Sequence, residues 1–159
     1  MSIEKDIALL RAVATFDMLA DDALHTLAAV AAERTLAAGE TLFHQGEASD
    51  GAYVVASGRI RFSDETKSRA KRLLKEVGPG ALIGETALMV ETPRPATAVA
   101  SEPTVLKFIA RAAFLRVLER HPEAATKLRR TIAKRLDDTI RALDSVRLKL
   151  EDQRQRRRR

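Results

Sequence analysis

Residues 83–99 read IGETALMVETPRPATAV, and this stretch decides how the chain is interpreted. Gly84 precedes a segment of helical composition, and a helix beginning near Glu85 would present unpaired backbone N–H groups that suit an anion. Arg94, nine residues after Glu85, adds a planar guanidinium able to hold two phosphate oxygens at once. The Glu85 carboxylate would repel a phosphate but accepts hydrogen bonds from sugar hydroxyls. The pattern fits a ligand with one phosphate charge beside a free hydroxyl, although a first-turn glutamate and an unrelated surface arginine would look the same.

The composition is that of a single soluble domain with a basic end. The 159 residues are 45% hydrophobic and 31% charged, which allows a sizeable core, and the absence of cysteine excludes disulfides and thiolate sites. The formal net charge is +6, and the last seven residues, QRQRRRR, hold five arginines, so the preceding residues sum to only +1. We expect residues 151–159 to form a disordered basic tail, of which 154–159 would be able to bind nucleic acid. No apolar run approaches about 20 residues, so we expect no membrane span and a cytoplasmic location.

The chain has helical ends and a β-rich middle. Apolar residues recur at helical spacing near both termini, whereas the middle holds short apolar stretches separated by glycines, as in a small closed or rolled antiparallel sheet. Ser57-Gly58 signals a hairpin turn, and the glycines and proline of 78–80 signal another break. The expected fold is α+β and mainly β. Residues 1–150 would be one domain, with N-terminal helices in 1–33, a β-roll in 34–109 and two C-terminal helices in 111–150.

The second C-terminal helix carries an apolar seam. His121 ends the first helix, and Pro122 suits the first turn of the next. Beyond it, apolar residues step by 4, 3, 4, 3 and 4 positions, with Thr139 the only polar member. We interpret the seam as a parallel homodimer coiled coil; packing of this stripe on the chain's own roll is the alternative. The apolar seam residues are Ile132, Leu136, Leu143, Val146 and Leu150.

Two stretches, AGETLFHQGEASDGAYVVASGRIRF (38–62) and GALIGETALMVETPRPATAVA (80–100), resemble the cyclic nucleotide-binding domain family. This family includes catabolite activator-type regulators, the regulatory subunit of protein kinase A and cyclic nucleotide-gated channels. The resemblance is strongest in the phosphate-binding cassette, here residues 83–97. It implies an eight-stranded antiparallel β-roll flanked by helices and a cyclic nucleotide as ligand.

The resemblance also implies roles for individual residues. Glu85 would hold the ribose 2′-hydroxyl and Arg94 the cyclic phosphate, near Ala96. The segment from Gly84 through Thr86 to Ala87 would present backbone amides to the ligand. In the catabolite activator group a threonine on the long C-terminal helix contacts the base, and Thr139 falls at that position; a tolerated interface threonine is the alternative. Arg135, one turn earlier, would pair with Glu85 across the site.

Pro95 departs from the family pattern, in which a small residue follows the arginine and donates its N–H to the phosphate. Proline has no N–H, and a hydrogen bond to a charged group contributes about 1.5–3 kcal/mol. The prolines on either side of Arg94 would, however, hold it extended and lower the entropy lost on binding. The sequence leaves open which effect is larger. Relatives that prefer cyclic GMP tend to carry threonine or serine at this position. Because that hydroxyl is absent here and Thr139 is present, we expect cyclic AMP as the preferred ligand and cyclic GMP as the alternative.

The remaining motifs exclude most enzyme classes. The three histidines, His25, His44 and His121, lie far apart, so no metal site is expected, and no triad, Walker loop or GxGxxG motif is present. We expect a stand-alone bacterial sensor, not an enzyme and without a cofactor, that lacks a DNA-binding domain and signals to a separate effector protein by movement of its C-terminal helices. The alternative is a nucleotide-silent interaction protein that binds nucleic acid or an acidic partner through its arginine tail.

Overall fold

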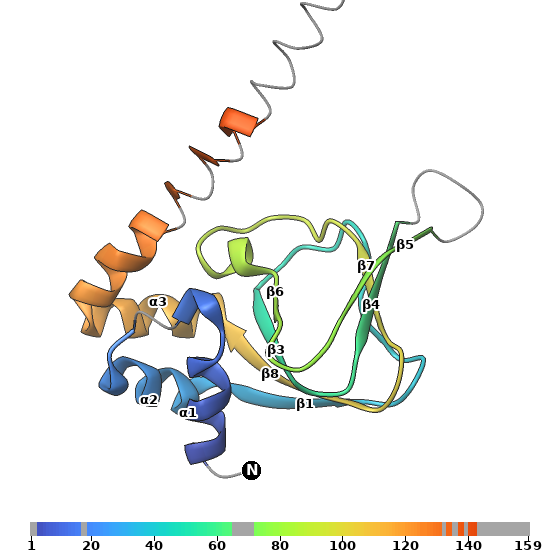
Figure 1. The fold of residues 1–159 in the computed structure, drawn as a ribbon, viewed down its shortest axis with the longest axis horizontal. Coiled ribbons are helices and arrows are strands. Elements are labelled where there is room, and N and C mark those ends of the chain that lie inside the picture. Colours follow the sequence, from blue (N-terminus) through green and yellow to red (C-terminus); the bar gives the residue numbers. More distant parts are fainter. Residues whose placement is uncertain are drawn as a thin grey trace, which may run out of the picture.

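The computed structural model describes residues 3–16, 19–64 and 72–131, together with 133–134, 137–138 and 140–142. Its strands form a rolled sheet structure with the helices gathered at one end (Figure 1). In chain order the elements are α1 (Ile3–Arg11), the 3-10 turn η1 (Ala14–Phe16), α2 (Asp21–Val30), β1 (Ala32–Leu36), β2 (Thr41–Phe43), β3 (Gly51–Ser57), β4 (Ile60–Asp64), β5 (Arg72–Val77), β6 (Leu82–Ile83), the 3-10 turn η2 (Glu85–Leu88), β7 (Thr97–Ala100), β8 (Thr104–Ala110) and α3 (Arg111–Arg120).

The eight strands form two antiparallel sheets of four. One has the order β1-β8-β3-β6 and the other β2-β7-β4-β5. All of the strand pairs are antiparallel, and β8 is central because it pairs with both β1 and β3. The expected mainly-β fold with eight antiparallel strands is confirmed.

The hairpin expected at Ser57-Gly58 is wrong, because the two strands that this turn joins lie in different sheets. β3 pairs with β6 and β8, whereas β4 pairs with β5 and β7. Gly58 has a φ of 91°, and a Cβ there would overlap the side-chain oxygen of Thr104. That oxygen also accepts a hydrogen bond from the Arg59 backbone N–H at 3.1 Å. The glycine is therefore needed for a corner at which the chain changes sheet, and local sequence shows the turn but not the partner of each strand.

The core has two parts that share strand β3. Successive side chains of a strand point to opposite faces. Ala52 and Val54 accordingly pack with the helices, whereas Tyr53 and Val55 point into the roll. The helical part also includes a contact between the rings of Phe16 and Phe114, whose centroids are 6.2 Å apart, and this contact joins η1 to α3. Because β3 is buried on both faces, it positions the helices and the roll relative to each other.

A buried ion pair fixes α1 to the first sheet. The Lys107 ammonium, on β8, lies 3.4 Å from a carboxylate oxygen of Asp6 and 3.6 Å from one of Glu33, and its side chain is 7% exposed. Asp6 lies in α1 and is itself buried. Removing one partner of a buried pair is costly because the other charge is left unpaired in a poorly solvated site. The pair therefore favours one position of α1 on β8.

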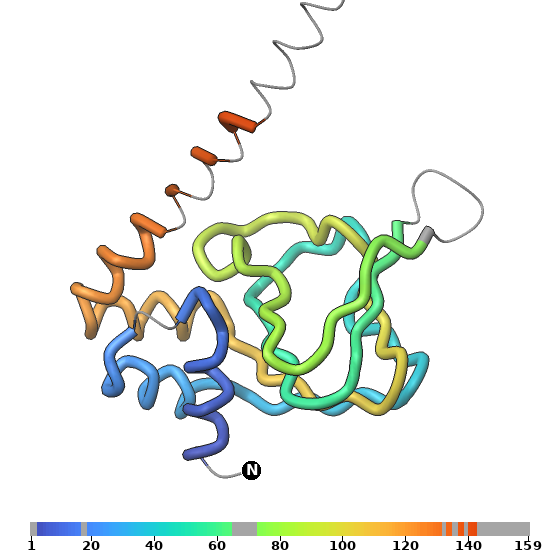
Figure 2. Tube along the Cα trace, viewed as in Figure 1, coloured from blue at the N-terminus to red at the C-terminus, as the bar shows by residue number. Residues whose placement is uncertain are grey.

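The helix expected after Pro122 is present over residues 122–131 and leads away from the end of α3 (Figure 2). The base-contacting Thr139, its neighbour Arg135, the basic tail and the apolar seam lie outside the described residues. The coiled coil, the homodimer and the tail's function therefore stay predictions. The seam residues concerned are Ile132, Leu136, Leu143, Val146 and Leu150.

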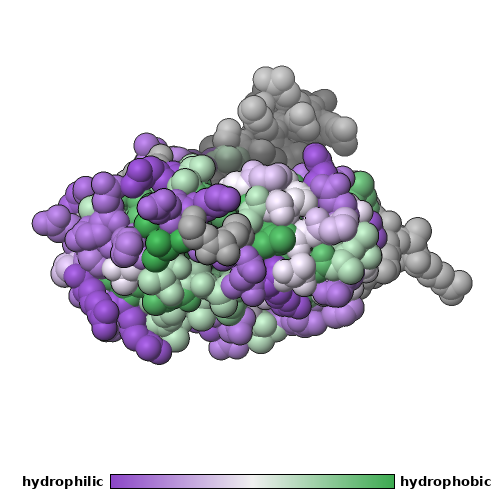
Figure 3. Space-filling model, turned by 90° about the horizontal axis from the view of Figure 1, so that it is seen from below, coloured by the Kyte–Doolittle hydropathy of each residue, from purple (hydrophilic) through white to green (hydrophobic). Residues whose placement is uncertain are grey.

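Several large apolar side chains of the described residues are exposed at the surface. On the face seen from below Figure 1, hydrophobic groups alternate with hydrophilic ones (Figure 3). Scattered apolar residues of this kind are normal on a protein surface and mark no interface by themselves. In the part of the chain that the structure describes, the exposed large hydrophobic residues are Ile3, Val30, Leu73, Leu74, Val90 and Ile140.

Candidate functional site

The stretch that opened the sequence analysis forms a turn and a return segment between β6 and β7. Gly84 adopts a left-handed conformation, with φ 80° and ψ 42°, and the helix expected from Glu85 is a single 3-10 turn, η2. Within it the Ala87 N–H donates to the Gly84 carbonyl at 3.0 Å. The turn cannot extend far, because Leu88 is anchored in the core and Pro93 disfavours helical geometry in the residue before it.

Backbone hydrogen bonds fix Arg94 on its way back to β7. Its N–H donates to the Glu47 carbonyl and its carbonyl accepts from the Gly46 N–H, both at 2.8 Å. Pro93 forms an isolated bridge with Ala48. Residues 46–48 thus hold Arg94 extended by pairing, independently of the proline that follows it.

The Arg94 side chain is a buried cation. It is 5% exposed, and its guanidinium lies 4.4 Å from the ring centroid of Phe43 and 5.7 Å from that of Tyr53. Its Nη2 donates to the Gly51 carbonyl at 2.9 Å. Among the described residues, none of the ion pairs within 4 Å involves Arg94.

Burial lowers the pKa of Arg94, an effect that the neighbouring Tyr53, Asp50 and Glu47 oppose and Arg111 reinforces. An arginine nonetheless stays protonated in proteins. Arg94 is therefore a desolvated positive charge, and an anion placed beside it would recover part of the electrostatic energy lost on burial.

Gly84 leaves the space that the guanidinium occupies. A Cβ at this position would lie 2.5 Å from Nη1 of Arg94. The glycine thus serves both the left-handed turn and the close approach of Arg94 to the backbone.

Glu85 is oriented from the N-terminal part of the chain. Thr15, a buried residue of η1, donates its hydroxyl to the Glu85 carboxylate at 3.1 Å. Sequence reasoning missed Thr15, because nothing local distinguishes a threonine that packs against a residue 70 positions away. The partner expected for Glu85, Arg135, lies outside the described residues.

Arg94 lines several cavities, and two of them also share Gly84 and Pro95. One, of about 270 Å³, contains Glu85. The other, of about 380 Å³, carries only apolar side chains besides Arg94 and Lys75. Every ligand residue predicted between Gly84 and Ala96 lines one or both. The remaining lining residues are Thr86, Ala87, Thr92 and Pro93 in the first and Phe43, Phe62, Leu74, Lys75, Val77, Leu82, Ile83 and Ala96 in the second.

The apolar cavity adds residues that the sequence analysis missed. β4 pairs with β5 so that Phe62 lies opposite Lys75, and the Lys75 ammonium sits 5.4 Å from the Phe62 ring centroid. The residues facing this cavity come from several strands, and only their pairing register brings them together.

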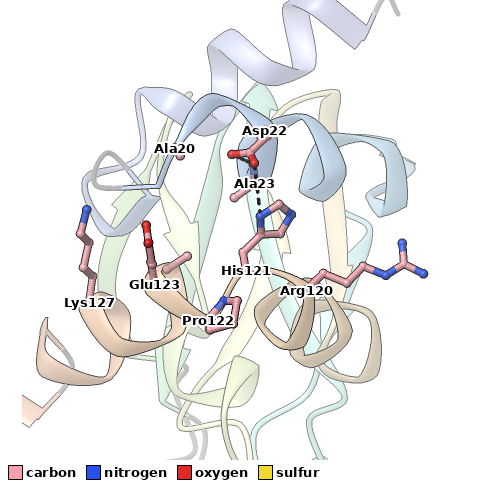
Figure 4. A pocket seen from close by; sticks show the side chains of 9 residues that line it. Ala20, Asp22, Ala23, Arg120, His121, Pro122, Glu123 and Lys127 are labelled. Carbon is pink, nitrogen blue, oxygen red and sulfur yellow. Dashed lines mark hydrogen bonds and ion pairs between the residues drawn. The ribbon is translucent and has the colours of Figure 1, made fainter.

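One further cavity also includes Arg94, and another lies among the helices. The first, of about 400 Å³, contains Arg34 and Arg111 together with acidic residues. The second, of about 430 Å³, lies between α2 and the junction of α3 with the next helix (Figure 4). There the His121 Nδ1 lies 3.6 Å from the Asp22 carboxylate. His121 directly follows the last residue of α3, so it is a helix-end residue as expected. No predicted ligand residue lines this cavity. Arg94 lines both the apolar cavity and the cavity that contains Glu85.

The described residues include neither a cluster suited to a metal ion nor a helix suited to span a membrane. Within the described ranges, no group of three or more histidine, aspartate or glutamate side chains is arranged to hold a metal ion. In the same part of the chain, no helix has the length and apolar character needed to cross a membrane.

A family model described as "Cyclic nucleotide-binding domain" matches residues 33–121. The chain is 37% identical over 106 residues to the Cyclic AMP receptor protein of Thermus thermophilus, covering 67% of this chain and 49% of that protein. It is 34% identical over 103 residues to Lysophospholipase nte1 of Neosartorya fischeri, covering 65% of this chain and 7% of that protein. The chain therefore spans half or less of the length of these relatives.

The structural comparison agrees with the sequence comparison. The N-terminal domain of a transcriptional regulator from Streptomyces coelicolor A3(2) superimposes with a TM-score of 0.80 at 36% identity, covering 85% of this chain and 94% of that one. The lysophospholipase match is confined to a small part of that enzyme, so its activity does not carry over to this chain.

Proposed function

This chain belongs to the cyclic nucleotide-binding domain family, and we propose that it is a regulatory module that binds a cyclic nucleotide, with cyclic AMP preferred, across Arg94. The observation that carries the proposal is the position of Arg94. It is a buried cation where a cavity containing a carboxylate meets a cavity with apolar walls. A cyclic nucleotide has the matching sequence of groups, namely a sugar hydroxyl, a singly charged phosphate and an aromatic base.

The three parts of the ligand would divide between the two cavities. The phosphate would accept hydrogen bonds from the Arg94 guanidinium, which forms two parallel bonds to phosphate oxygens with good geometry. The ribose 2′-hydroxyl would donate to Glu85, which Thr15 already orients. The base would enter the apolar cavity of about 380 Å³, where Phe62 offers an aromatic wall. An amide contact from Ala87 would require its bond to the Gly84 carbonyl to open first.

The preference for cyclic AMP rests on Pro95, which lines both cavities and offers no hydroxyl of the kind seen in similar proteins that prefer cyclic GMP. The proposal also includes the cytoplasmic location, a homodimer and a separate effector protein. Output would pass through α3, which contacts η2 directly. A ligand shifts α3 only if it binds one arrangement more tightly than the other.

Calorimetric titration of ligand-stripped protein with cyclic AMP, cyclic GMP and 2′-deoxy cyclic AMP tests the proposal. We expect the tightest binding for cyclic AMP. The 2′-deoxy compound should bind at least about ten-fold more weakly, because a hydrogen bond to a charged group contributes about 1.5–3 kcal/mol. No heat with either cyclic AMP or cyclic GMP would contradict the proposal.

Replacing Pro95 with alanine should strengthen cyclic AMP binding by about ten-fold. The backbone of Arg94 is already held by Gly46 and Glu47, so the ring of Pro95 adds little order. Neighbouring residues of an extended chain direct their N–H groups to opposite sides, so an N–H at position 95 would face away from residues 46–47. One more donor to a charged phosphate is worth about 1.5–3 kcal/mol.

Titration of Pro95→Ala against wild type measures this effect. Pro79→Ala, in an exposed turn that lines neither cavity, is the matched control and should bind as wild type does. Equal binding by Pro95→Ala would mean that the proline's ordering of Arg94 offsets the missing donor, and weaker binding would mean that it outweighs it; either result would contradict the prediction.

A further inference from the structure

Three consecutive backbone carbonyls connect the two arginines Arg94 and Arg111. The Ser49 carbonyl accepts from Nη1 of Arg111 at 3.1 Å, and the Asp50 carbonyl accepts from the Arg111 backbone N–H at 2.8 Å. The next carbonyl, that of Gly51, accepts from Nη2 of Arg94 at 2.9 Å. Arg111 is the first residue of α3, so this short segment lies directly between Arg94 and that helix.

Arg111 also contacts the turn that carries Glu85. The same Nη1 atom donates to the Ala87 carbonyl, in η2, at 3.2 Å. One half-buried side chain therefore joins η2, the segment 49–51 and the start of α3. A charged donor forms stronger hydrogen bonds than a neutral one, so these contacts favour a single arrangement of the three elements.

Residues 49–51, which lie between Arg94 and Arg111, have little room to move. A Cβ at Gly51 would overlap the carbonyl oxygen of Ile109, so the backbones of β3 and β8 are in close contact there. Gly51 pairs with Ala110, the residue before Arg111. A shift of the Gly51 carbonyl would consequently be passed to the start of α3 and not be lost in a loop.

We propose that Arg111 is the positioning residue that transmits occupancy of Arg94 to α3. This inference rests on the proposed function, because it requires an anion at Arg94. A phosphate would compete with the Gly51 carbonyl for Nη2, and any movement of η2 toward the ligand would act on the Ala87 carbonyl. Both changes converge on Arg111, whose charge also contributes to the lowered pKa of Arg94.

Amide hydrogen exchange in the ligand-free protein tests the connection by itself. In Arg111→Gln we expect the amides of residues 85–90 and 49–51 to exchange at least about ten-fold faster, while β4 and β5 keep their wild-type rates. Arg116→Gln, which removes an exposed arginine from the same helix, is the matched control and should leave all these rates unchanged. Unchanged exchange at residues 85–90 in Arg111→Gln would overturn the inference.

Exchange with saturating cyclic AMP tests the transmission. In wild type we expect nucleotide to alter exchange both at residues 85–94 and in α3. In Arg111→Gln the response at 85–94 should persist, with affinity within about ten-fold of wild type, while the response of α3 is lost. Arg111→Lys keeps the charge but loses the planar guanidinium, so the response of α3 should be intermediate. This variant replaces Arg111→Gln in the test if the glutamine variant does not fold.

The possible failures are distinguishable. A wild-type α3 response in Arg111→Gln at saturating nucleotide would overturn the role of Arg111 and leave the binding site intact. A wild-type protein that shows no exchange response to nucleotide anywhere would instead overturn the proposed function. A merely structural role would change stability and exchange in both states without separating the response of α3 from that of residues 85–94.

Discussion

Arg94→Ala should weaken cyclic AMP binding by at least about 100-fold. In the proposed complex the guanidinium would form two charge-assisted hydrogen bonds to the phosphate, each contributing about 1.5–3 kcal/mol. Among the described residues, Arg94 is the one cation that lines both the cavity containing Glu85 and the apolar cavity, so we expect neither Lys75 nor Arg111 to replace it fully. Calorimetric titration gives the affinity, and a denaturation curve shows whether the variant remains folded at the temperature used.

Two further variants separate charge from geometry. Arg94→Lys keeps the charge but loses the planar fork, and we expect it to bind more weakly than wild type and more tightly than Arg94→Ala. Arg59→Ala removes an arginine that is half exposed and paired with Glu76, so it should bind as wild type does. Wild-type affinity in Arg94→Ala would show that the phosphate is held elsewhere.

Gly51→Ala should lower the free energy of unfolding by at least about 4 kcal/mol, a loss found only for severe structural faults. A Cβ at this position would overlap the Ile109 carbonyl oxygen and lie 2.9 Å from the Cα of Ala110 and 2.8 Å from the Phe108 ring. Two of these neighbours are backbone atoms of β8, at residues that pair directly with β3, so relieving the overlap would require a shift of that strand pairing. The loss would come from overlap alone.

Gly78→Ala is the matched control. Its nearest atom to a new Cβ is the Gly58 carbonyl oxygen at 3.9 Å, an ordinary contact, so the substitution should change stability by less than about 0.5 kcal/mol. Urea denaturation of both variants compares them. Similar stabilities would mean that β3 and β8 are not as closely packed as described.

The sequence predicted those parts of the site that depend on local chemistry. Gly84, Glu85 and Arg94 lie within eleven residues, and their chemistry is evident without knowing the fold. The structure places all three along the two adjoining cavities. The glycine pattern likewise indicated most of the corners, because positive φ angles have a strong local signature, whereas Gly51 begins strand β3 without a positive φ.

What the sequence did not reveal depends on contacts between distant residues. Thr15 reaches Glu85 across 70 positions, and Arg111 reaches Ser49 across 62. Nothing in the sequence around Lys107 indicates its ion pair, because its partner Asp6 lies far away in the sequence, in α1. The error at Ser57-Gly58 has the same origin, because a turn signal does not state which strands will pair.

The most direct test of the central claim is a crystal structure of the protein with cyclic AMP bound. The account predicts phosphate oxygens within hydrogen-bonding distance of the Arg94 guanidinium, the ribose 2′-hydroxyl on Glu85 and the base in the cavity beside Phe62. A phosphate held by Arg34 and Arg111 in the neighbouring cavity, with Arg94 still bonded to the Gly51 carbonyl, would contradict it.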